Sequence, residues 1–353
     1  MDSGRRLFLS VAPLWLACSS ARADARGRLS LWAGDATAHG HRDGARLQAT
    51  FFDPRGLARD PRDGAIIVAD AANALIRRID AHGMVQTLAG SPEQRSSVDG
   101  PAAQARFVGP DAVAIGPDGA VYIADAFANT VRVLRDGVVR TLAGRAGEPG
   151  FADGVGARAQ FNHPIGVALR GGELLVADAY NNTLRAIDRA GRVRTIAGTP
   201  GVADHRDGAA AQALFNTPVG LAVAADGTVY VSEYFNHDLR RLAADGMVST
   251  LAGAPGRPGD VDGAGGAARL RKPQQICIEP GSGAIIVADG GNRKVRRVDR
   301  AGRVSTLAGQ GEQADRFAFG ALPGALVTPY GVTSGPDGSV LVSSGEALLR
   351  IDA

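Results

Sequence analysis

The chain has little cysteine. Of its 353 residues two are cysteines, and only Cys277 lies beyond the first 23 residues. No internal disulfide can therefore hold the rest of the chain together, and its stability has to come from packing. Cys277 takes the position that Ala58, Ala168 and Ala222 hold in the repeats described below. We expect a small, inward-facing slot and an inert buried thiol there, not a nucleophile.

An excess of one charge is also missing. The first 23 residues hold three of the 39 Lys and Arg residues and one of the 36 Asp and Glu residues. The remainder therefore carries 36 basic and 35 acidic residues, a net charge of +1. Only Lys272 and Lys294 are lysines, so the basic residues are almost all arginine. Proteins that bind nucleic acid normally show a marked basic excess, so we expect no nucleic-acid partner.

No apolar run is long enough for a stable transmembrane anchor. The run Leu7–Cys18 follows Arg5-Arg6 and precedes Ala21-Arg22-Ala23, an order typical of a cleaved export signal. The arginine pair also resembles a twin-arginine signal, and the ordinary Sec route remains the alternative. We predict a signal peptide over residues 1–23 and a single mature domain over residues 24–353, periplasmic or secreted.

Familiar catalytic motifs are absent as well. The sequence contains no nucleophile elbow, phosphate loop or zinc-ligand spacing. The glycine-rich segment Gly253–Gly266 is not followed by a strand and helix, which favours a connection over a nucleotide cradle. We therefore assign no catalytic residue and favour a protein without enzymatic activity, with the enzyme class kept open as the alternative below.

What fills the chain instead is a repeat of about 55 residues. Six prolines open equivalent strands at spacings of 56, 54, 54, 55 and 56 residues: Pro54, Pro110, Pro164, Pro218, Pro273 and Pro329. One Ala-Gly pair ends each unit. The six pairs, from Ala33-Gly34 to Ala308-Gly309, follow one another at the same spacings as the prolines. Within residues 161–198, four short runs of β-forming residues alternate with Gly, Asn and Asp turns. One such meander exposes both faces, so it must stack on its copies.

The two ends of the chain complement each other. The last repeat stops after three strands, at Ala347–Asp352, and Gly27–Gly34 parallels the fourth strand Gly302–Gly309. Pairing the two ends leaves no free sheet edge. The predicted fold is all-β: a six-bladed β-propeller of four-stranded antiparallel blades, with the N-terminal strand completing the C-terminal blade.

These motifs resemble the NHL-repeat β-propellers. The matching residues are the opening Pro54–Ala58, the core Val68-Ala69-Asp70 with Asn73 and Ile76-Arg77, and the closing Thr87–Gly90. The resemblance covers nearly all of the mature chain and implies a propeller fold. It implies no single activity, because such propellers serve as protein-binding, RNA-binding, lyase and lactonase-like modules.

Residues that recur in the repeats are assigned to the blades themselves. The turn acids (Asp70, Asp125, Asp178 and Asp289, with Glu233 and Ser344 as substitutes) and the amides (Asn73, Asn181, Asn236 and Asn292) should bind turn N–H groups. The arginines should pair between neighbouring strands: Arg77, Arg132, Arg185, Arg240, Arg296 and Arg350. In the connections, Asp43, Asp99, Asp153, Asp207 and Asp262 are interpreted as caps of short helical turns. Each is followed by an anchor buried between blades: Phe51, Phe107, Phe161, Phe215 or Leu270.

Residues that break the pattern beside the prolines are candidate ligand contacts at the mouth of the central channel: Asp53, Asp111, His163, Lys272, Gln274, Gln275 and Tyr330. Gln275 is the clearest, because four other repeats have glycine there and the fifth has Ala112. Asp53, Asp111 and His163 lie on successive repeats and could in principle hold Ca²⁺ or Zn²⁺. Two of them precede their prolines while Asp111 follows its own, so convergence is not expected. Solvated polar side chains are favoured, and no cofactor is assigned.

The longest loops lie on one rim, which is the default binding face. Aromatic residues on its Asp–Asn turns could form a recognition patch or cover blade edges: Phe127, Tyr180, Tyr234 and Phe235. His41 and His205 hold matching loop positions three blades apart, too far to share a ligand. The favoured hypothesis is a monomeric binding scaffold for a protein or a small polar, carbohydrate-like ligand. The alternative is a metal-dependent lactonase or lyase with its site at the channel mouth.

Overall fold

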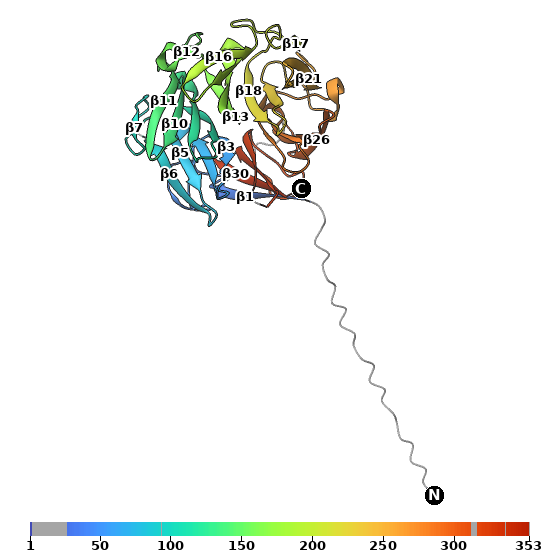
Figure 1. The fold of residues 1–353 in the computed structure, drawn as a ribbon. Coiled ribbons are helices and arrows are strands. Elements are labelled where there is room, and N and C mark those ends of the chain that lie inside the picture. The colour runs from blue at the N-terminus through green and yellow to red at the C-terminus, as the bar shows by residue number, and fades with distance from the viewer. Residues whose placement is uncertain (2–26, 93, 312–315, 336, 353) are drawn as a thin grey trace.

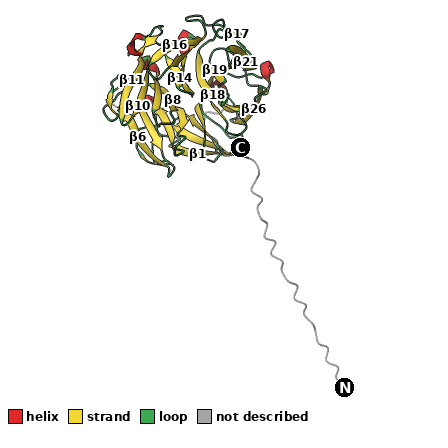
Figure 2. Ribbon diagram, viewed as in Figure 1, coloured by secondary structure: helices red, strands yellow, loops and turns green. Residues whose placement is uncertain are grey.

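Six twisted sheets stand in a ring around a central axis (Figure 1). The computed structural model describes residue 1 and residues 27–92, 94–311, 316–335 and 337–352. The predicted export signal lies outside the described residues, apart from Met1. Strands and loops make up almost all of the ring, with only short helical turns on its rim (Figure 2). No helix among the described residues has both the length and the apolar character needed to cross a membrane.

Each blade is an antiparallel sheet of five strands, ordered from the channel outward. Blade 1 contains β3 (Pro54–Arg59), β4 (Ile66–Asp70), β5 (Leu75–Ile79), β6 (Met84–Gly90) and β2 (Gly44–Ala45). Blade 2 contains β8 (Pro110–Ile115), β9 (Val121–Asp125), β10 (Thr130–Arg135), β11 (Val138–Gly144) and β7 (Gly100–Pro101). Blade 3 contains β13 (Pro164–Arg170), β14 (Glu173–Asp178), β15 (Thr183–Ile187), β16 (Arg192–Ala197) and β12 (Gly154–Val155).

The remaining blades repeat this order. Blade 4 contains β18 (Pro218–Val223), β19 (Val229–Glu233), β20 (Asp238–Leu242), β21 (Met247–Gly253) and β17 (Gly208–Ala209). Blade 5 contains β23 (Pro273–Ile278), β24 (Ile285–Asp289), β25 (Lys294–Val298), β26 (Arg303–Ala308) and β22 (Gly263–Ala264). Blade 6 contains β28 (Pro329–Ser334), β29 (Val340–Ser344), β30 (Ala347–Asp352), β1 (Arg28–Gly34) and β27 (Gly320–Ala321).

The fifth strand corrects the prediction of four-stranded blades. It is a two-residue segment of the connection that pairs with the outer edge of the blade, as Gly44 does with Val85. The preceding Asp43 caps no helical turn. Its carboxylate accepts a hydrogen bond from the backbone N–H of Thr87 on β6 (2.9 Å), and thereby binds the connection to the blade.

The seam between the two ends is confirmed. β1 lies antiparallel to β30, with Arg28 opposite Asp352 and Gly34 opposite Ala347. In Figure 1 the blue N-terminal strand β1 lies beside the red strand β30. No sheet edge is left unpaired at this point, so the ring is closed by hydrogen bonds between its own ends.

The apolar core is divided into layers between neighbouring blades. One layer combines Leu175 of blade 3 with Val229 of blade 4 and the connection residue Phe215, which is fully buried. The other predicted anchors are also fully buried: Phe51, Phe107, Phe161 and Leu270. Close to the axis the backbones themselves meet. A Cβ at Gly166 would lie 2.0 Å from the carbonyl oxygen of Val219 in the next blade, so only glycine fits.

A buried arginine joins three parts of each of the first five blades. In blade 1, Arg77 is fully buried and donates to the turn acid Asp70 (2.7 Å) and to the connection residue Asp43 (2.6 Å). Its guanidinium lies 5.1 Å from the ring centre of the anchor Phe51. The turn acid accepts the backbone N–H of Phe52 (2.8 Å), which lies in the connection and not in the turn as predicted. The Asn73 amide, also predicted to bind turn N–H groups, instead donates to this carboxylate (2.9 Å). Arginine, turn and connection therefore form one structural network.

Arg350 does not belong to this set, which corrects its assignment. The ladder places Leu349, not Arg350, opposite Val342, the position at which Arg77 lies opposite Val68. Arg350 instead pairs with Asp337 (2.6 Å) and Asp352 (2.7 Å) at the surface. Blade 6 thus has Leu349 and Ser344 where the other blades have a buried ion pair.

Candidate functional site

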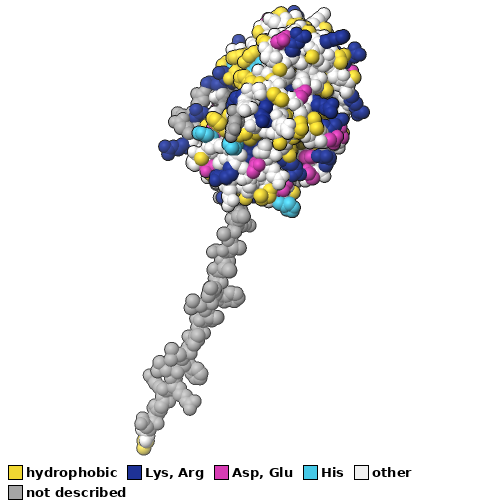
Figure 3. Space-filling view, turned by 90° about the vertical axis from the view of Figure 1, so that its left-hand side faces the viewer, with side chains coloured by type: hydrophobic (Ala, Val, Ile, Leu, Met, Phe, Trp, Pro, Cys, Tyr) yellow, Lys and Arg dark blue, Asp and Glu magenta, His cyan; other side chains and the backbone are white. Residues whose placement is uncertain are grey.

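The two faces of the ring differ in their loops. The turns after the second strand and the long connections lie on one face, which we call the loop-rich face. The opposite face carries the tight turns between the first and second and between the third and fourth strands, and the connections reach it at the two-residue strands. On the outer side of the ring shown in Figure 3, basic and acidic side chains are interspersed, without a continuous patch of one charge.

Polar side chains of three blades meet where the channel reaches the loop-rich face. Asp111 is almost fully buried, with 1% of its side chain exposed. It accepts hydrogen bonds from Arg55 Nη1 (2.5 Å) and from the hydroxyl of Tyr330 (2.6 Å). Arg55 Nε also donates to Asp53 (2.9 Å), and its guanidinium carbon lies 4.9 Å from the ring centre of Tyr330. Asp53 and Asp111 therefore converge, contrary to the expectation from their positions relative to proline, because the long arginine side chain reaches both.

The single cation of this cluster, Arg55, is bound by two carboxylates. Burial alone would lower the pKa of Arg55, but Asp111, Tyr330 and Asp53 raise that pKa well above its usual value. Burial and the neighbouring Asp111 raise the pKa of Tyr330 well above 10. At neutral pH the cluster thus holds a charged guanidinium and a neutral phenol. Among the described residues no group of three or more His, Cys, Asp or Glu side chains is placed to hold a metal ion.

Side chains close the channel at this end. The residue after the opening proline in each blade contributes to the closure: Arg55, Asp111, Ile165, Val219, Gln274 and Tyr330. Below them the innermost strands line an open hollow of about 290 Å³ in the channel. Gln275 is buried on the wall of this hollow, and its Nε2 has no partner among the described residues. Cys277 also lies on this wall, half-buried, and desolvation raises the pKa of its thiol to about 12.

His163 is held between two aromatic rings on the loop-rich face. It stacks on Tyr180, with ring centres 4.6 Å apart, and meets the edge of Phe127 at 4.8 Å. Its backbone has a left-handed φ of 56°, and its N–H donates to Asn129 Oδ1 (2.9 Å) on the preceding blade. Burial lowers the pKa of His163, so the imidazole is neutral at pH 7. The residue is thus a packing partner of two aromatic side chains.

Lys272 belongs to a second aromatic group. Its ammonium lies 5.4 Å from the ring centre of Tyr234, which meets Phe235 edge-on at 4.8 Å. The backbone N–H of Lys272 donates to Nδ1 of His237 (3.1 Å) on the preceding blade. The lysine charge is therefore available above an aromatic surface, an arrangement that favours cation–π attraction.

Three of the exposed aromatic residues occupy equivalent positions on successive blades. Phe127, Tyr180 and Phe235 each lie two residues after the turn acid of blades 2, 3 and 4, and we call them the aromatic crescent. Their exposed fractions are 55%, 55% and 50%. Blades 1 and 5 have Ala72 and Gly291 at this position. The aromatic crescent thus spans the turns of blades 2, 3 and 4, and the charged cluster lies at the centre of the loop-rich face.

Sequence reasoning missed the role of Arg55, although the signal was present. Arg55 breaks the pattern at the same position as Asp111 and Tyr330, the residue after the proline. Position alone did not reveal that three such residues on adjacent blades would bind one another.

A hollow lies on the opposite face, between blades 2 and 3. It measures about 710 Å³, and Tyr122, Leu142 and Leu169 contribute to its walls. It exists because the turns at 136–137 and 171–172 are shorter than those of the other blades. None of the candidate residues lines this hollow.

Comparison with known proteins supports the repeat. The NHL repeat family matches residues 161–187. The chain is 30% identical over 283 residues to Protein SUPPRESSOR OF QUENCHING 1, chloroplastic, of Arabidopsis thaliana, covering 75% of this chain and 27% of that protein. It is 30% identical over 175 residues to NHL repeat-containing protein 2 of Bos taurus, covering 45% of this chain and 24% of that protein. The chain thus spans about a quarter of the length of these two curated relatives.

A solved structure shows the same fold. The chain is similar to an auxiliary nutrient binding protein from Bacteroides thetaiotaomicron, with a TM-score of 0.70 and 16% identity. The match covers 92% of this chain and 76% of that one. At this identity the likeness concerns the fold alone.

Proposed function

The chain is an NHL-repeat six-bladed β-propeller, and from this premise we propose that it is an exported, non-catalytic binding scaffold. Its ligand is a small, polar, carbohydrate-like molecule held on the loop-rich face. The observation that carries the proposal is the aromatic crescent, three half-exposed rings at equivalent positions beside a fixed polar cluster. Export to the periplasm or the medium is proposed from the N-terminal segment.

The crescent suits a ligand with apolar ring faces and polar edges. Aromatic rings offer a large, rigid contact area at low entropic cost, and a few positioned polar groups then fix the orientation of the ligand. Tyr180 is supported from behind by His163, and Phe235 is supported by Tyr234. The rings are therefore preorganised, which reduces the entropy lost on binding.

The polar cluster favours binding over catalysis. Asp111 already accepts two hydrogen bonds, and Asp53 is engaged by Arg55. Neither carboxylate is placed as a free base or as a ligand for an ion. The solved structure with the same fold that is described as a nutrient binding protein is consistent with this class of function.

Screening on a glycan array followed by calorimetry tests the proposal. We expect the mature chain to bind an oligosaccharide, and Tyr180→Ala or Phe235→Ala to cost about 2 kcal/mol, roughly a 30-fold rise in Kd. Met247→Ala is the matched control, because Met247 is similarly exposed (48%) but lies at the start of β21 on the opposite face.

Three outcomes contradict the proposal. If Met247→Ala lost as much affinity as the Tyr180 and Phe235 variants, the ligand would not bind specifically at the crescent. Turnover of the bound glycan would assign the protein to the enzyme class. Binding of a protein with no glycan bound would replace the carbohydrate-like ligand by a protein partner.

A further inference from the structure

Blade 4 carries a buried carboxylate that the other blades lack. Asp238, the first residue of β20, is fully buried, and neither of its side-chain oxygens accepts a hydrogen bond among the described residues. The equivalent residues of the other blades are Leu75, Thr130, Thr183, Lys294 and Ala347. A buried, unpaired carboxylate is costly, so its presence needs a compensating group.

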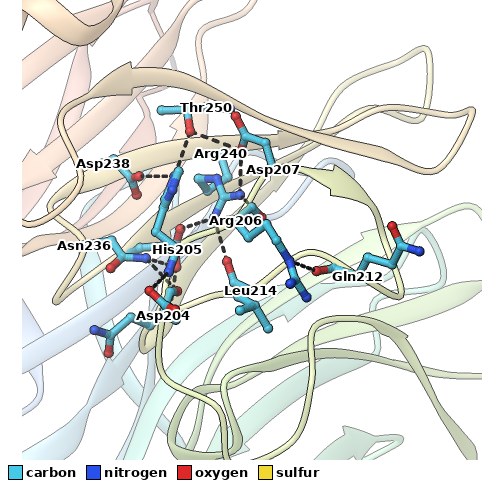
Figure 4. Close-up of polar contacts among 12 residues, drawn as sticks. Asp204, His205, Arg206, Asp207, Gln212, Leu214, Asn236, Asp238, Arg240 and Thr250 are labelled. Carbon is cyan, nitrogen blue, oxygen red and sulfur yellow. Dashed lines mark hydrogen bonds and ion pairs between the residues drawn. The ribbon is translucent and has the colours of Figure 1, made fainter.

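His205 of the connection supplies that group. Its Nε2 lies 3.3 Å from Asp238 Oδ2 and 2.8 Å from Thr250 Oγ1 (Figure 4). On its other side Asp238 faces Glu233, its direct partner in the ladder between β19 and β20. Two carboxylates and one imidazole are thus buried or half-buried together.

Without a bound proton, the charges around Asp238 are more negative by one than those of the equivalent arrangement in blade 1. The charged groups that face these three residues are Arg240, Asp207 and Asp204. Arg240 is already bound by Glu233 (2.6 Å) and Asp207 (2.7 Å), in the same way that Arg77 is bound by two acids in blade 1. Asp238 adds one negative charge to this arrangement. Two carboxylates directly opposite each other in a sheet repel, and a proton between them removes the repulsion.

Blade 5 shows that these two positions form a link between connection and strand. Asp260 and Lys294 are equivalent to His205 and Asp238, and they form an ion pair at 2.7 Å. In blade 4 the same link is made from groups that titrate.

We propose that His205, Asp238 and Glu233 share one exchangeable proton, and that this proton fastens the connection 204–215 to β20 as a pH-sensitive lock. The proton belongs to the group of three and not to any single residue.

The directions of titration agree with the geometry. Burial raises the pKa of Asp238 to about 7 and that of Glu233 well above its usual value. Burial lowers the pKa of His205, which directs the proton toward the carboxylates. The folded chain therefore holds a proton that the unfolded chain releases near pH 4, so stability falls as pH rises from about 4 and the lock is lost above about pH 7.

The lock also regulates the loop-rich face, and this part rests on the proposed function. Asn236 Nδ2 donates to both Glu233 and the carbonyl oxygen of Asp204. Tyr234 and Phe235 lie on the turn between Glu233 and Asn236. Release of the connection removes one of the supports of that turn, so a ligand of the crescent should bind more weakly at alkaline pH.

Hydrogen exchange of the intact mature chain tests the lock without any ligand. We expect protection of a peptide covering residues 204–215, corrected for intrinsic rates, to fall about tenfold between pH 6 and pH 8.5. The equivalent blade 5 peptide, residues 259–270, should show no such step. Asp238→Asn, a neutral residue of the same shape, should keep the protection at pH 8.5. The double variant His205→Asp/Asp238→Lys, which copies blade 5, should also remain protected.

The lock would be overturned if protection of residues 204–215 in the wild-type chain did not change with pH. It would also be overturned if residues 259–270 of blade 5 lost protection over the same pH range. A step that persists in Asp238→Asn would overturn it too, since no proton could then be lost from that side chain. These measurements stand whether or not a glycan binds. If the step is present and no ligand is found, the lock stands and only its link to binding fails.

Discussion

Replacing the buried arginine of blade 3 by leucine should destabilise the ring severely. Arg185 is fully buried and donates to Asp178 (2.7 Å), Asp153 (2.6 Å) and the carbonyl oxygens of Ala152 (2.8 Å) and Gln160 (3.2 Å). Arg185→Leu removes all four bonds. It leaves Asp178, which is also fully buried, without its cation.

The magnitude follows from the carboxylate left behind. Breaking a buried ion pair from one side costs about 3–5 kcal/mol, because the remaining charge is desolvated and unpaired. The double variant Asp178→Ser/Arg185→Leu removes that charge and copies the pair of blade 6, Ser344 and Leu349. We expect it to recover most of the loss and to remain within about 2 kcal/mol of wild type.

The loss should also depend on pH. Burial already raises the pKa of Asp178 to about 6 in the presence of Arg185, and removal of the arginine raises that pKa further. At pH 5 the carboxyl group of the single variant is protonated in the folded chain and the penalty is small. At pH 8 the full penalty applies, so the destabilisation grows as pH rises.

Urea unfolding of the three proteins at pH 5 and pH 8 measures these differences. The reasoning is refuted if Arg185→Leu costs less than about 1 kcal/mol at pH 8, or if the double variant is no more stable than the single one. The second result would mean that the arginine itself, and not the stranded carboxylate, determines the loss.

Three further outcomes are expected. Gly166→Ala forces a Cβ against the carbonyl oxygen of Val219 and should cost about 1–3 kcal/mol in urea unfolding, and a neutral result would contradict the close approach. Cys277, with a pKa of about 12, should react slowly with a thiol reagent at pH 8 in the folded chain and rapidly in urea; equal rates would show that the thiol is accessible and ionised. Leu29→Asp buries a charge at the seam opposite Ile351 and should abolish cooperative unfolding, so an unchanged transition would show that β1 does not close the ring.

The repeat can be predicted from the sequence because the geometry of a blade requires each of the residues that mark it. A proline opens each innermost strand, an Ala-Gly pair ends each fourth strand, and a large apolar residue is needed between blades. The seam follows from the same logic, since three strands at one end and one at the other complete a sheet.

Shorter features are not predictable in the same way. The two-residue strand at Gly44–Ala45 is too short to show any alternation, so the sequence favours a helix cap at Asp43. The misassignment of Arg350 has a visible cause. Five repeats separate the turn acid from the arginine by seven residues, and the last separates Ser344 from Arg350 by six.

In the candidate site, the position of a residue in its repeat does not predict which side chains it contacts. Whether Asp53 and Asp111 meet depends on the reach and rotamer of the arginine between them, and neither follows from strand order. The aromatic crescent is visible in the sequence as residues on turns, but its half-ring arrangement requires the order of the blades. The charge imbalance at Asp238 requires knowledge of which side chains are buried.

The pairing of β1 with β30 also governs how the chain can fold. Each of the first five blades is made from one continuous stretch, so it can form while the rest is being synthesised. The sixth must wait until residues 347–352 exist and can find a partner more than 300 positions away. The contact between β1 and β30 has the largest sequence separation in the sheets, so blade 6 should form most slowly and last. Because residues 28 and 352 lie side by side, a short linker could join them and new ends could be opened at the tight turn 136–137. Such a permuted chain would complete blade 6 from one continuous stretch and would move the long-range closure to blade 2, between β10 and β11.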